Sequence, residues 1–420
     1  MADSFVVLPP LTANGCVVFG TNSHRPACEV QEVVLVKGSD HNVEEEKCKC
    51  TYIEIDQVAR TYTTILSKPG WAWGAEMGAN EKGVCAVNHP VWNKLIGKED
   101  LKEKLIGQDI VRLVLERCAT ARESVDLIGQ LLITHGQGGP CSEESKDWAY
   151  HNSFLVVDSK EAWVVETAGK LWVAKVVKEG VRNLSNQLTI EAEYDLSSPD
   201  IVEQAKSLDL YKEEDGPFNF SRVFSERHCE DDANSEARFN KGKELLEKYS
   251  SAGNFKVKEM MEVLRSEEIN TYISGSFVTT GSQVSVLSPR PGISCHWFTA
   301  TPKPQASIFK PFIFCPNADI GHHTKSPVTG VVKPVNKEGA TSNPILVDRK
   351  HPLWLSHEKF QEKLNTMDPI GEMVLENIKE LESKCMEDME EMMSNFDESG
   401  ALKAAEIFMH IASIEINFYK

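Results

Sequence analysis

The 420-residue sequence has no run of apolar residues as long as the roughly 18 that a membrane-spanning helix requires. Its first residues also lack the basic and apolar segments of a secretory signal. These absences predict a protein that is not transmembrane and lies in the cytoplasm. Eleven cysteines are scattered along the chain, and no CxxC or His/Cys pair completes a metal half-site around Cys48 and Cys50. We therefore expect reduced thiols, no metal and no other cofactor.

Acidic residues outnumber basic ones: 63 Asp and Glu against 45 Lys and Arg give a formal net charge of −18. No segment gathers enough Lys and Arg to form a basic patch, and an acidic surface repels a phosphate backbone. This excludes nucleic acid as a partner. A hydrophobic fraction of 41% with 26% charged residues is typical of an ordinary globular protein.

Short segments rich in β-branched residues, bounded by Gly, Asn, Pro or charged residues, dominate the first part of the chain. This pattern predicts strands at residues 5–8, 16–20, 30–36, 51–55 and 61–67. Asn14 and Gly15 stand between the first two strands, and this dipeptide favours a tight hairpin turn because both central positions need positive φ. The first strand is therefore expected to begin almost at residue 1.

Helical periodicity follows at residues 108–118 and again after Thr120, where Glu123 completes a capping box. The later patterns predict strands at 153–157, 162–167, 171–177, 283–287 and 294–301, and helices at 235–249 and 257–264. Residues 316–350 are rich in Pro, Gly, Lys and Asn and predict a loop, with helices from residue 356 to the end. This order of elements predicts an α+β layered domain.

Several long segments are more specific than this pattern. They are DSFVVLPP at residues 3–10, EVQEVV at 29–34, CTYIEIDQV at 50–58, WGAEMGANEKGVC at 73–85, HGQGG at 135–139, RNLSNQL at 182–188 and SIFKPFIF at 307–314. Together they resemble the secernins, a dipeptidase-type family among the N-terminal-nucleophile hydrolases. The resemblance implies a four-layer αββα sandwich over residues 1–315, with residues 316–350 as an extended loop and the helices of residues 351–420 packing on the main domain.

In this superfamily the first residue of the mature chain is both nucleophile and general base, because its side chain and its free α-amino group belong to one residue. Family members usually carry Cys where this chain has Ser4. The resemblance therefore implies that Ser4 is the catalytic nucleophile, once Met1, Ala2 and Asp3 have been removed to expose its amine. The alternative is that Ser4 is only the polar start of an edge strand.

Two further positions depart from the family pattern. His24 stands where relatives usually have an Asp that holds the nucleophile's amine, and a neutral imidazole supplies no fixed negative charge. Thr21 stands where a basic residue commonly polarises the nucleophile or binds a carboxylate. The resemblance assigns His24 to the catalytic group and Thr21 to substrate binding, in a site that the three departures weaken, retool or inactivate.

Three more residues match family positions. Asn88, at the end of a predicted strand, matches an amide that stabilises the oxyanion, and Asn186 matches a polar residue that contacts the substrate or nucleophile. The alternative for each is an Asn that caps a turn. Arg25 is a candidate substrate-facing cation, and the alternative is a structural ion pair with Glu29 or Glu32.

Two functions of different classes follow. The resemblance implies a peptide- or amide-bond hydrolase of the dipeptidase type, with a small peptide or amide as substrate. The alternative is an inactive member that acts as a binding or regulatory protein, since the secernins as a family are linked to exocytosis. Residues 380–391, dense in acid and Met, form either a solvated helix or a surface for a protein partner. A Ser-His-Asp hydrolase is disfavoured because no G-x-S-x-G motif is present.

Overall fold

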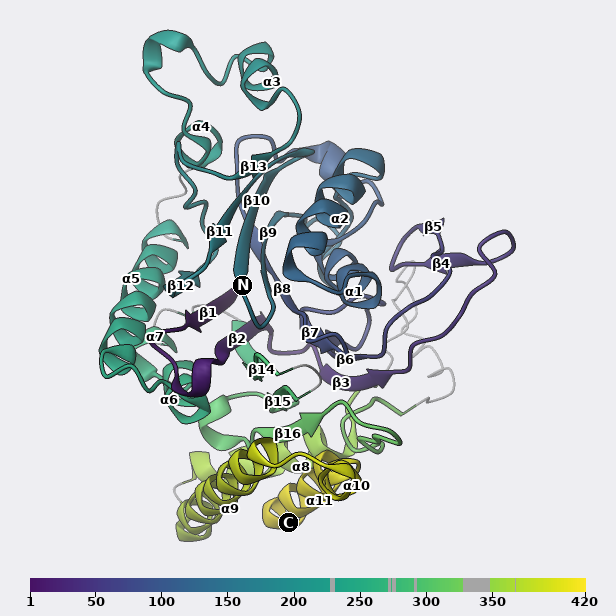
Figure 1. Cartoon of the computed structure of the whole chain (residues 1–420), viewed down its shortest axis with the longest axis vertical. Coiled ribbons are helices and arrows are strands. Elements are labelled where there is room, and N and C mark those ends of the chain that lie inside the picture. Colours follow the sequence, from purple (N-terminus) through teal and green to yellow (C-terminus); the bar gives the residue numbers. More distant parts are fainter. Residues whose placement is uncertain (227–230, 271–272, 274–276, 291–292, 328–347, 367) are drawn as a thin grey trace, which may run out of the picture.

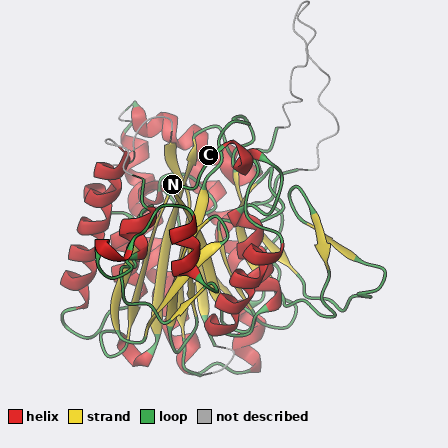
Figure 2. Ribbon diagram, turned by 90° about the horizontal axis from the view of Figure 1, so that it is seen from above, coloured by secondary structure: helices red, strands yellow, loops and turns green. Residues whose placement is uncertain are grey.

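The computed structural model describes residues 1–420 apart from 227–230, 271–272, 274–276, 291–292, 328–347 and 367. Two antiparallel sheets are stacked face to face, and helices cover the outer face of each (Figures 1 and 2). The layers therefore follow the order helix, sheet, sheet, helix. This confirms the α+β, four-layer αββα architecture that the resemblance predicted.

The larger sheet has eight strands in the order β13-β11-β10-β9-β8-β7-β6-β3. Their bounds are β3 (Gln31–Val36), β6 (Thr64–Pro69), β7 (Met77–Asn80), β8 (Cys85–Val91), β9 (His151–Val157), β10 (Ala162–Ala168), β11 (Leu171–Val177) and β13 (Leu196–Ser197). Helices α1 (Gly107–Arg117) and α2 (Ala121–Thr134) cover its outer face. Thr120 accepts a hydrogen bond from the amide of Glu123 and so caps α2, as predicted.

The smaller sheet has six strands in the order β12-β1-β2-β14-β15-β16. Their bounds are β1 (Ala2–Leu8), β2 (Val17–Pro26), β12 (Gly180–Leu184), β14 (Phe277–Leu287), β15 (Cys295–Phe298) and β16 (Lys310–Ile313). Helices α5 (Asp231–Ser250) and α6 (Val257–Leu264) cover one part of its outer face, over β1, β2 and β12. Helices α9 (Pro369–Ser394) and α11 (Ile407–Tyr419) lie against β16, and α8 (Pro352–Asn365) packs on both of them (Figure 1).

The remaining elements are short. They are the helices α3 (Ile201–Ser207), α4 (Phe220–Phe224), α7 (Glu267–Asn270) and α10 (Glu398–Ala404), and the two-stranded β4 (Lys47–Lys49) and β5 (Glu54–Asp56). In Figure 1, β4 and β5 project to one side of the stacked sheets. Part of the predicted loop at 316–350, namely residues 328–347, lies outside the described residues.

Strand alternation divides the apolar residues between two cores. Along β10, Val164 belongs to a cluster that joins residues of both sheets, whereas Val165 belongs to the cluster beneath α1 and α2. Successive side chains of a strand point to opposite faces, so each sheet buries both of its faces. The functional question is therefore which face each polar side chain of β1, β2 and β8 reaches.

Three local predictions differ from the structure. Residues 9–16 connect β1 to β2, so there is no tight hairpin turn, although Asn14 and Gly15 do have the predicted positive φ, 57° and 67°. The strand predicted at residues 51–55 is only partly present: β5 covers its last two residues, and β4 ends before it begins. β1 lies between β12 and β2, so Ser4 does not begin an edge strand. Local patterns predict extended backbone, but the pairing of strands depends on contacts that are distant in the sequence.

Candidate active site

Ser4 lies in β1 with its side chain fully buried. It is paired with Leu184 of β12 on one side and with Thr21 of β2 on the other. Its Oγ lies 2.8 Å from Thr21 Oγ1 and 2.7 Å from His89 Nε2. Because His89 belongs to β8 of the other sheet, the Ser4 hydroxyl points into the space between the two sheets.

His89 is the base nearest to Ser4, and the sequence analysis did not identify it. Its Nδ1 lies 3.1 Å from the carbonyl oxygen of Ala2, which can only accept, so Nδ1 carries the proton and Nε2 accepts from the Ser4 hydroxyl. Burial lowers the pKa of His89 to about 3, and the ring is therefore neutral at pH 7. The two side chains form a hydroxyl–imidazole pair in which the imidazole is a weak base.

Asp3, next to Ser4 in the chain, faces the opposite side of the sheet. Its carboxylate lies 3.0 Å from Arg238 Nε of α5 and 2.8 Å from His24 Nε2, and all three side chains are fully buried. Burial alone would raise the pKa of Asp3, but the Arg238 charge and the His24 hydrogen bond hold it well below its usual range. Asp3 is thus a buried carboxylate that compensates the charge of Arg238.

His24 supports Asp3 and does not reach Ser4. Burial lowers the pKa of His24 below its ordinary value, so the neutral ring donates from Nε2 to Asp3, while Nδ1 lies 3.0 Å from Thr279 Oγ1. His24 is three residues after Thr21 in β2, and an odd separation along a strand places two side chains on opposite faces. Of these two predicted residues, the structure brings only Thr21 to the Ser4 side chain.

Asn186 contacts the start of β1, but at residue 2 and not at Ser4. Its Oδ1 accepts from the amide of Ala2 at 3.1 Å and from Arg238 Nη2 at 2.8 Å, and its Nδ2 donates to the carbonyl of Pro90 at 2.9 Å. Its φ of 56° is left-handed, which Asn tolerates better than most residues. The structure therefore gives Asn186 both a turn conformation and contacts near the N-terminus.

Residues 1–3, which precede Ser4 in the chain, are held against β2. Ala2 and Asp3 pair with β2, and the Met1 amine donates to the carbonyl of His24 at 2.8 Å. Burial, together with the nearby charge of Arg25, lowers the pKa of that amine to about 5. With these residues in place, the nitrogen of Ser4 is a peptide amide inside a strand and offers no basic lone pair.

Arg25 forms one of the ion pairs considered from the sequence. Its guanidinium is 1% exposed, with Nη2 2.5 Å from Glu29 and Nη1 3.4 Å from Glu76. Glu32 instead pairs with Lys68 at 3.3 Å. Arg25 also donates to a backbone carbonyl at 2.8 Å, so its charge is compensated within the protein.

The Asn88 side chain lies on the face of β8 opposite to that of His89. Its Nδ2 donates to Asn152 Oδ1 at 2.9 Å and lies so close to Gly107, the first residue of α1, that a Cβ there would come within 2.6 Å of it. Since Asn88 and His89 are consecutive in the strand, only one of them can face Ser4. The side chain of Asn88 lies beneath α1, away from the Ser4 hydroxyl.

Within the described part of the chain, no group of three or more His, Cys, Asp or Glu side chains is arranged to hold a metal ion. None of its helices is both long enough and apolar enough to cross a membrane.

One family model, Peptidase family C69, matches residues 19–264. These 246 residues (264 − 19 + 1) are more than half of the 420-residue chain. The chain belongs to peptidase family C69. By its description this is a family of peptidases, that is, of enzymes that hydrolyse peptide bonds.

Several solved structures resemble this family C69 chain at low identity. A variant of conjugated bile acid hydrolase from Clostridium perfringens is 15% identical, covers 71% of this chain and 88% of its own, and has a TM-score of 0.42. Penicillin V acylase from Agrobacterium tumefaciens is 12% identical, with coverages of 74% and 86% and a TM-score of 0.42. A Caenorhabditis elegans ortholog of N-acylethanolamine-hydrolyzing acid amidase is 11% identical, with coverages of 67% and 91% and a TM-score of 0.34.

The C69 match covers most of the candidate site but not its first strand. Thr21, His24, His89 and Arg238 lie inside residues 19–264, whereas Ser4 lies before them. His89 directly follows Asn88 in β8, so alternation predicts that only one of the two faces Ser4, and the structure shows that it is His89. Arg238 could not be found in this way, because it reaches Asp3 across 235 positions of the chain.

Proposed function

We propose that this chain is a secernin-type peptide or amide hydrolase that is latent while residues 1–3 remain in place, with Ser4 as its nucleophile. The observation that carries the proposal is the 2.7 Å contact between Ser4 Oγ and His89 Nε2 within the sandwich of a family C69 chain. This contact holds the Ser4 hydroxyl in the space between the two sheets, where in a processed chain the amine of the same residue would accept its proton. The substrate is a small peptide or amide.

Removal of residues 1–3 supplies what the intact chain lacks. The new α-amine of Ser4 takes the hydroxyl proton as Oγ attacks the carbonyl carbon of the substrate. The carbonyl π bond breaks as the new C–O bond forms, and the leaving amine receives the proton when the tetrahedral intermediate collapses. Water then hydrolyses the resulting ester and restores Ser4. The intact chain is expected to be inactive, because the base that Ser4 contacts among the described residues is His89, whose pKa of about 3 makes it a poor proton acceptor at pH 7.

Intact mass measurement and N-terminal sequencing of the purified full-length chain test the proposal. We expect a species that begins at Ser4 and hydrolyses a panel of dipeptides, and a chain that begins at Met1 or Ala2 without activity. Ser4→Ala should abolish the activity of the processed species, whereas Thr21→Val should reduce it without abolishing it. A processed species whose activity survives in Ser4→Ala would contradict the proposed nucleophile.

The second candidate is a binding protein without catalysis, and the buried position of Asp3 favours it. Loss of residues 1–3 would remove the carboxylate that contacts both Arg238 and His24. Removing one partner of a buried ion pair is destabilising, so the fold resists this processing. In this case the exposed acidic residues of α9, among them Glu387 and Glu390, are a candidate surface for a regulatory partner. The secernin resemblance points to a partner in exocytosis.

A chain released from a fusion partner so that it begins at Ser4 separates the two candidates. If it is folded and cleaves dipeptides, the hydrolase proposal stands. If it is folded and inactive on the whole panel, or if it fails to fold while the chain starting at Ala2 is stable, the binding function is favoured. Circular dichroism of both chains distinguishes an inactive fold from an unfolded chain.

A further inference from the structure

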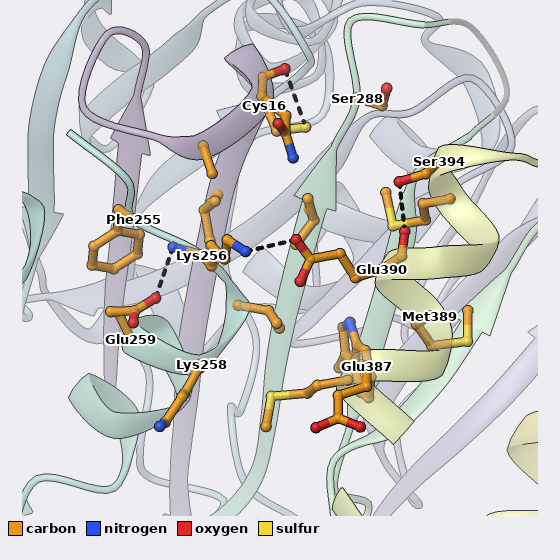
Figure 3. A pocket seen from close by; sticks show the side chains of 18 of the residues that line it. Cys16, Phe255, Lys256, Lys258, Glu259, Ser288, Glu387, Met389, Glu390 and Ser394 are labelled. Carbon is orange, nitrogen blue, oxygen red and sulfur yellow. Dashed lines mark hydrogen bonds and ion pairs between the residues drawn. The ribbon is translucent and has the colours of Figure 1, made fainter. Parts of the chain in front are cut away.

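A cavity of about 630 Å³ lies between the six-stranded sheet and the second half of α9 (Figure 3). Its walls come from the connection between β1 and β2, the start of α6, the end of β14 and residues 383–394 of α9. Residues that line it include Cys16, Phe255 and Met389, which Figure 3 labels. Its volume falls within the range of small-molecule sites.

This cavity is separate from the Ser4 site because it lies on the other face of the sheet. Thr21 of β2 points to Ser4 between the two sheets. Gly20 instead approaches the side chain of Met260 in α6, and Asn22 donates to the carbonyl of Leu264, so even-numbered residues of β2 face the helices. Val18, which lines the cavity, belongs to this second set.

The floor of the cavity is apolar and adaptable. Trp297 and Phe255, 2% and 0% exposed, contribute flat aromatic surface, and three methionines of α9 form the opposite wall: Met386, Met389 and Met393. Methionine side chains are flexible and polarisable, so they fit apolar ligands of irregular shape. The apolar part of a ligand would lie here.

Three carboxylates and three cations line the cavity, and they are only partly paired with one another. Each carboxylate has a partner: Glu390 pairs with Lys256 at 2.6 Å, Glu387 pairs with Lys384 at 3.7 Å, and Glu259 accepts from the amide of Lys256 at 2.9 Å. Among the described residues, the guanidinium of Arg290 donates to the two last carbonyls of α9, at 2.7 and 3.3 Å, and Lys258 has no carboxylate within ion-pair distance.

The guanidinium of Arg290 is exposed and has no carboxylate partner among the described residues. It is nevertheless close enough to the cavity to act on a side chain that lines it. Burial raises the pKa of the Cys16 thiol, and the charge of Arg290 partly opposes this rise. Arg290 and Lys258 therefore stand at this cavity without a carboxylate partner among the described residues, which is the arrangement that an anionic head group completes.

We propose that this cavity binds a small amphipathic carboxylate, with its apolar chain between Trp297 and the α9 methionines and its carboxylate on Arg290. The site is independent of the Ser4 chemistry and is present whether or not residues 1–3 are removed. Its ligand would also contact both α9 and the end of β14, near the two hydrogen bonds that Arg290 donates to α9.

Isothermal titration of the full-length chain with decanoate, and with decan-1-ol as its uncharged match, tests the proposal. We expect saturable one-to-one binding of decanoate that is about tenfold or more tighter than that of decan-1-ol, because a charge-assisted contact is lost in the alcohol. Arg290→Gln should remove this difference, and Arg60→Gln, at an exposed ion pair elsewhere, should preserve it.

A cavity-filling variant keeps the test decisive if Arg290→Gln loosens the end of α9. Met386→Trp, which places a large ring on the wall, should weaken both ligands at least tenfold while circular dichroism stays unchanged. Equal affinities for decanoate and decan-1-ol would overturn the role of Arg290. The absence of saturable binding, or binding that neither variant alters, would overturn the site itself.

Discussion

Asp3 and Ser4 are consecutive residues whose side chains lie on opposite faces of β1 and contact different layers of the molecule. Strand geometry sends Ser4 to His89 between the sheets and Asp3 to Arg238 beneath α5. Any processing that makes Ser4 the first residue therefore removes a carboxylate from a buried cluster at the same time. The energetics of Asp3 bear directly on whether the site can become active.

Asp3→Asn is expected to lower the free energy of unfolding by about 3 kcal/mol, because it removes the carboxylate that pairs with Arg238 and accepts from His24 in a fully buried cluster. The pKa of Asp3 is lowered in the folded state, so its contribution is present above the ordinary carboxyl pKa of about 4 and is lost as the pH falls toward the folded value. Urea unfolding at pH 7 and at pH 3 measures this, and the loss should be smaller at pH 3. Asp40→Asn, at an exposed position, is the control and should have almost no effect.

His24 was interpreted from the sequence as a degraded form of an acidic residue, but the structure gives it a partner that is itself acidic. His24→Asp would place a second carboxylate against Asp3, where Nε2 now donates at 2.8 Å. We expect this variant to be destabilised by several kcal/mol, because two buried like charges repel and one must take up a proton. His24→Gln, whose amide can still donate to Asp3, should cost about 1 kcal/mol. Thermal unfolding of the two variants compares them, and a His24→Asp chain as stable as His24→Gln would contradict this account of the cluster.

At the scale of elements, the sequence predicted well which segments are extended or helical. It predicted poorly which of these segments lie next to one another in the structure. The periodicity at residues 108–118 corresponds to α1, and the capping box at Thr120 begins α2. Local propensity cannot tell that β1 pairs with β12, which lies far along the chain, or that β1 is an interior strand. The positive φ of Asn14 was foreseen, but the length of its connection was not, because that length depends on where the two strands stop pairing.

The candidate site shows the same limit. Residues were predicted as a group because they match one family pattern, yet the structure divides them among faces. Thr21 meets Ser4, His24 meets Asp3, and the side chain of Asn88 lies beneath α1. A family pattern gives positions along the chain, whereas the face that each side chain reaches depends on the parity of its place in a strand. The distant partner Arg238 has no local signal at all.

At the scale of the whole molecule, buried ion pairs join the C-terminal helices to β16 of the six-stranded sheet and to the end of α6. Lys310 of β16 pairs with Glu415 of α11 at 2.6 Å with both side chains fully buried. Glu382 of α9 accepts from Arg265 at 2.6 Å and from the amide of Phe309 at 2.8 Å. If the C-terminal helices separated from the main domain, the buried charges of these ion pairs would lose their partners or become exposed to water. We therefore infer that residues 351–420 unfold together with the main domain.

Two neighbouring glutamates of α9 test whether the C-terminal helices and the main domain unfold together. Glu382→Gln should lower the free energy of unfolding by about 3–5 kcal/mol, because Arg265 loses its carboxylate at a buried contact. The control is Glu380→Gln, two residues away on the exposed side of the helix, which should have almost no effect. Far-UV circular dichroism follows all the helices, while tryptophan fluorescence reports mainly on residues 71–297, where seven of the eight tryptophans lie. In Glu382→Gln the two signals should shift together, as they must if the C-terminal helices and the sandwich form one cooperative unit. A transition seen by circular dichroism well before the fluorescence change would mean that α9 and α11 detach first and that the helices form a separate domain.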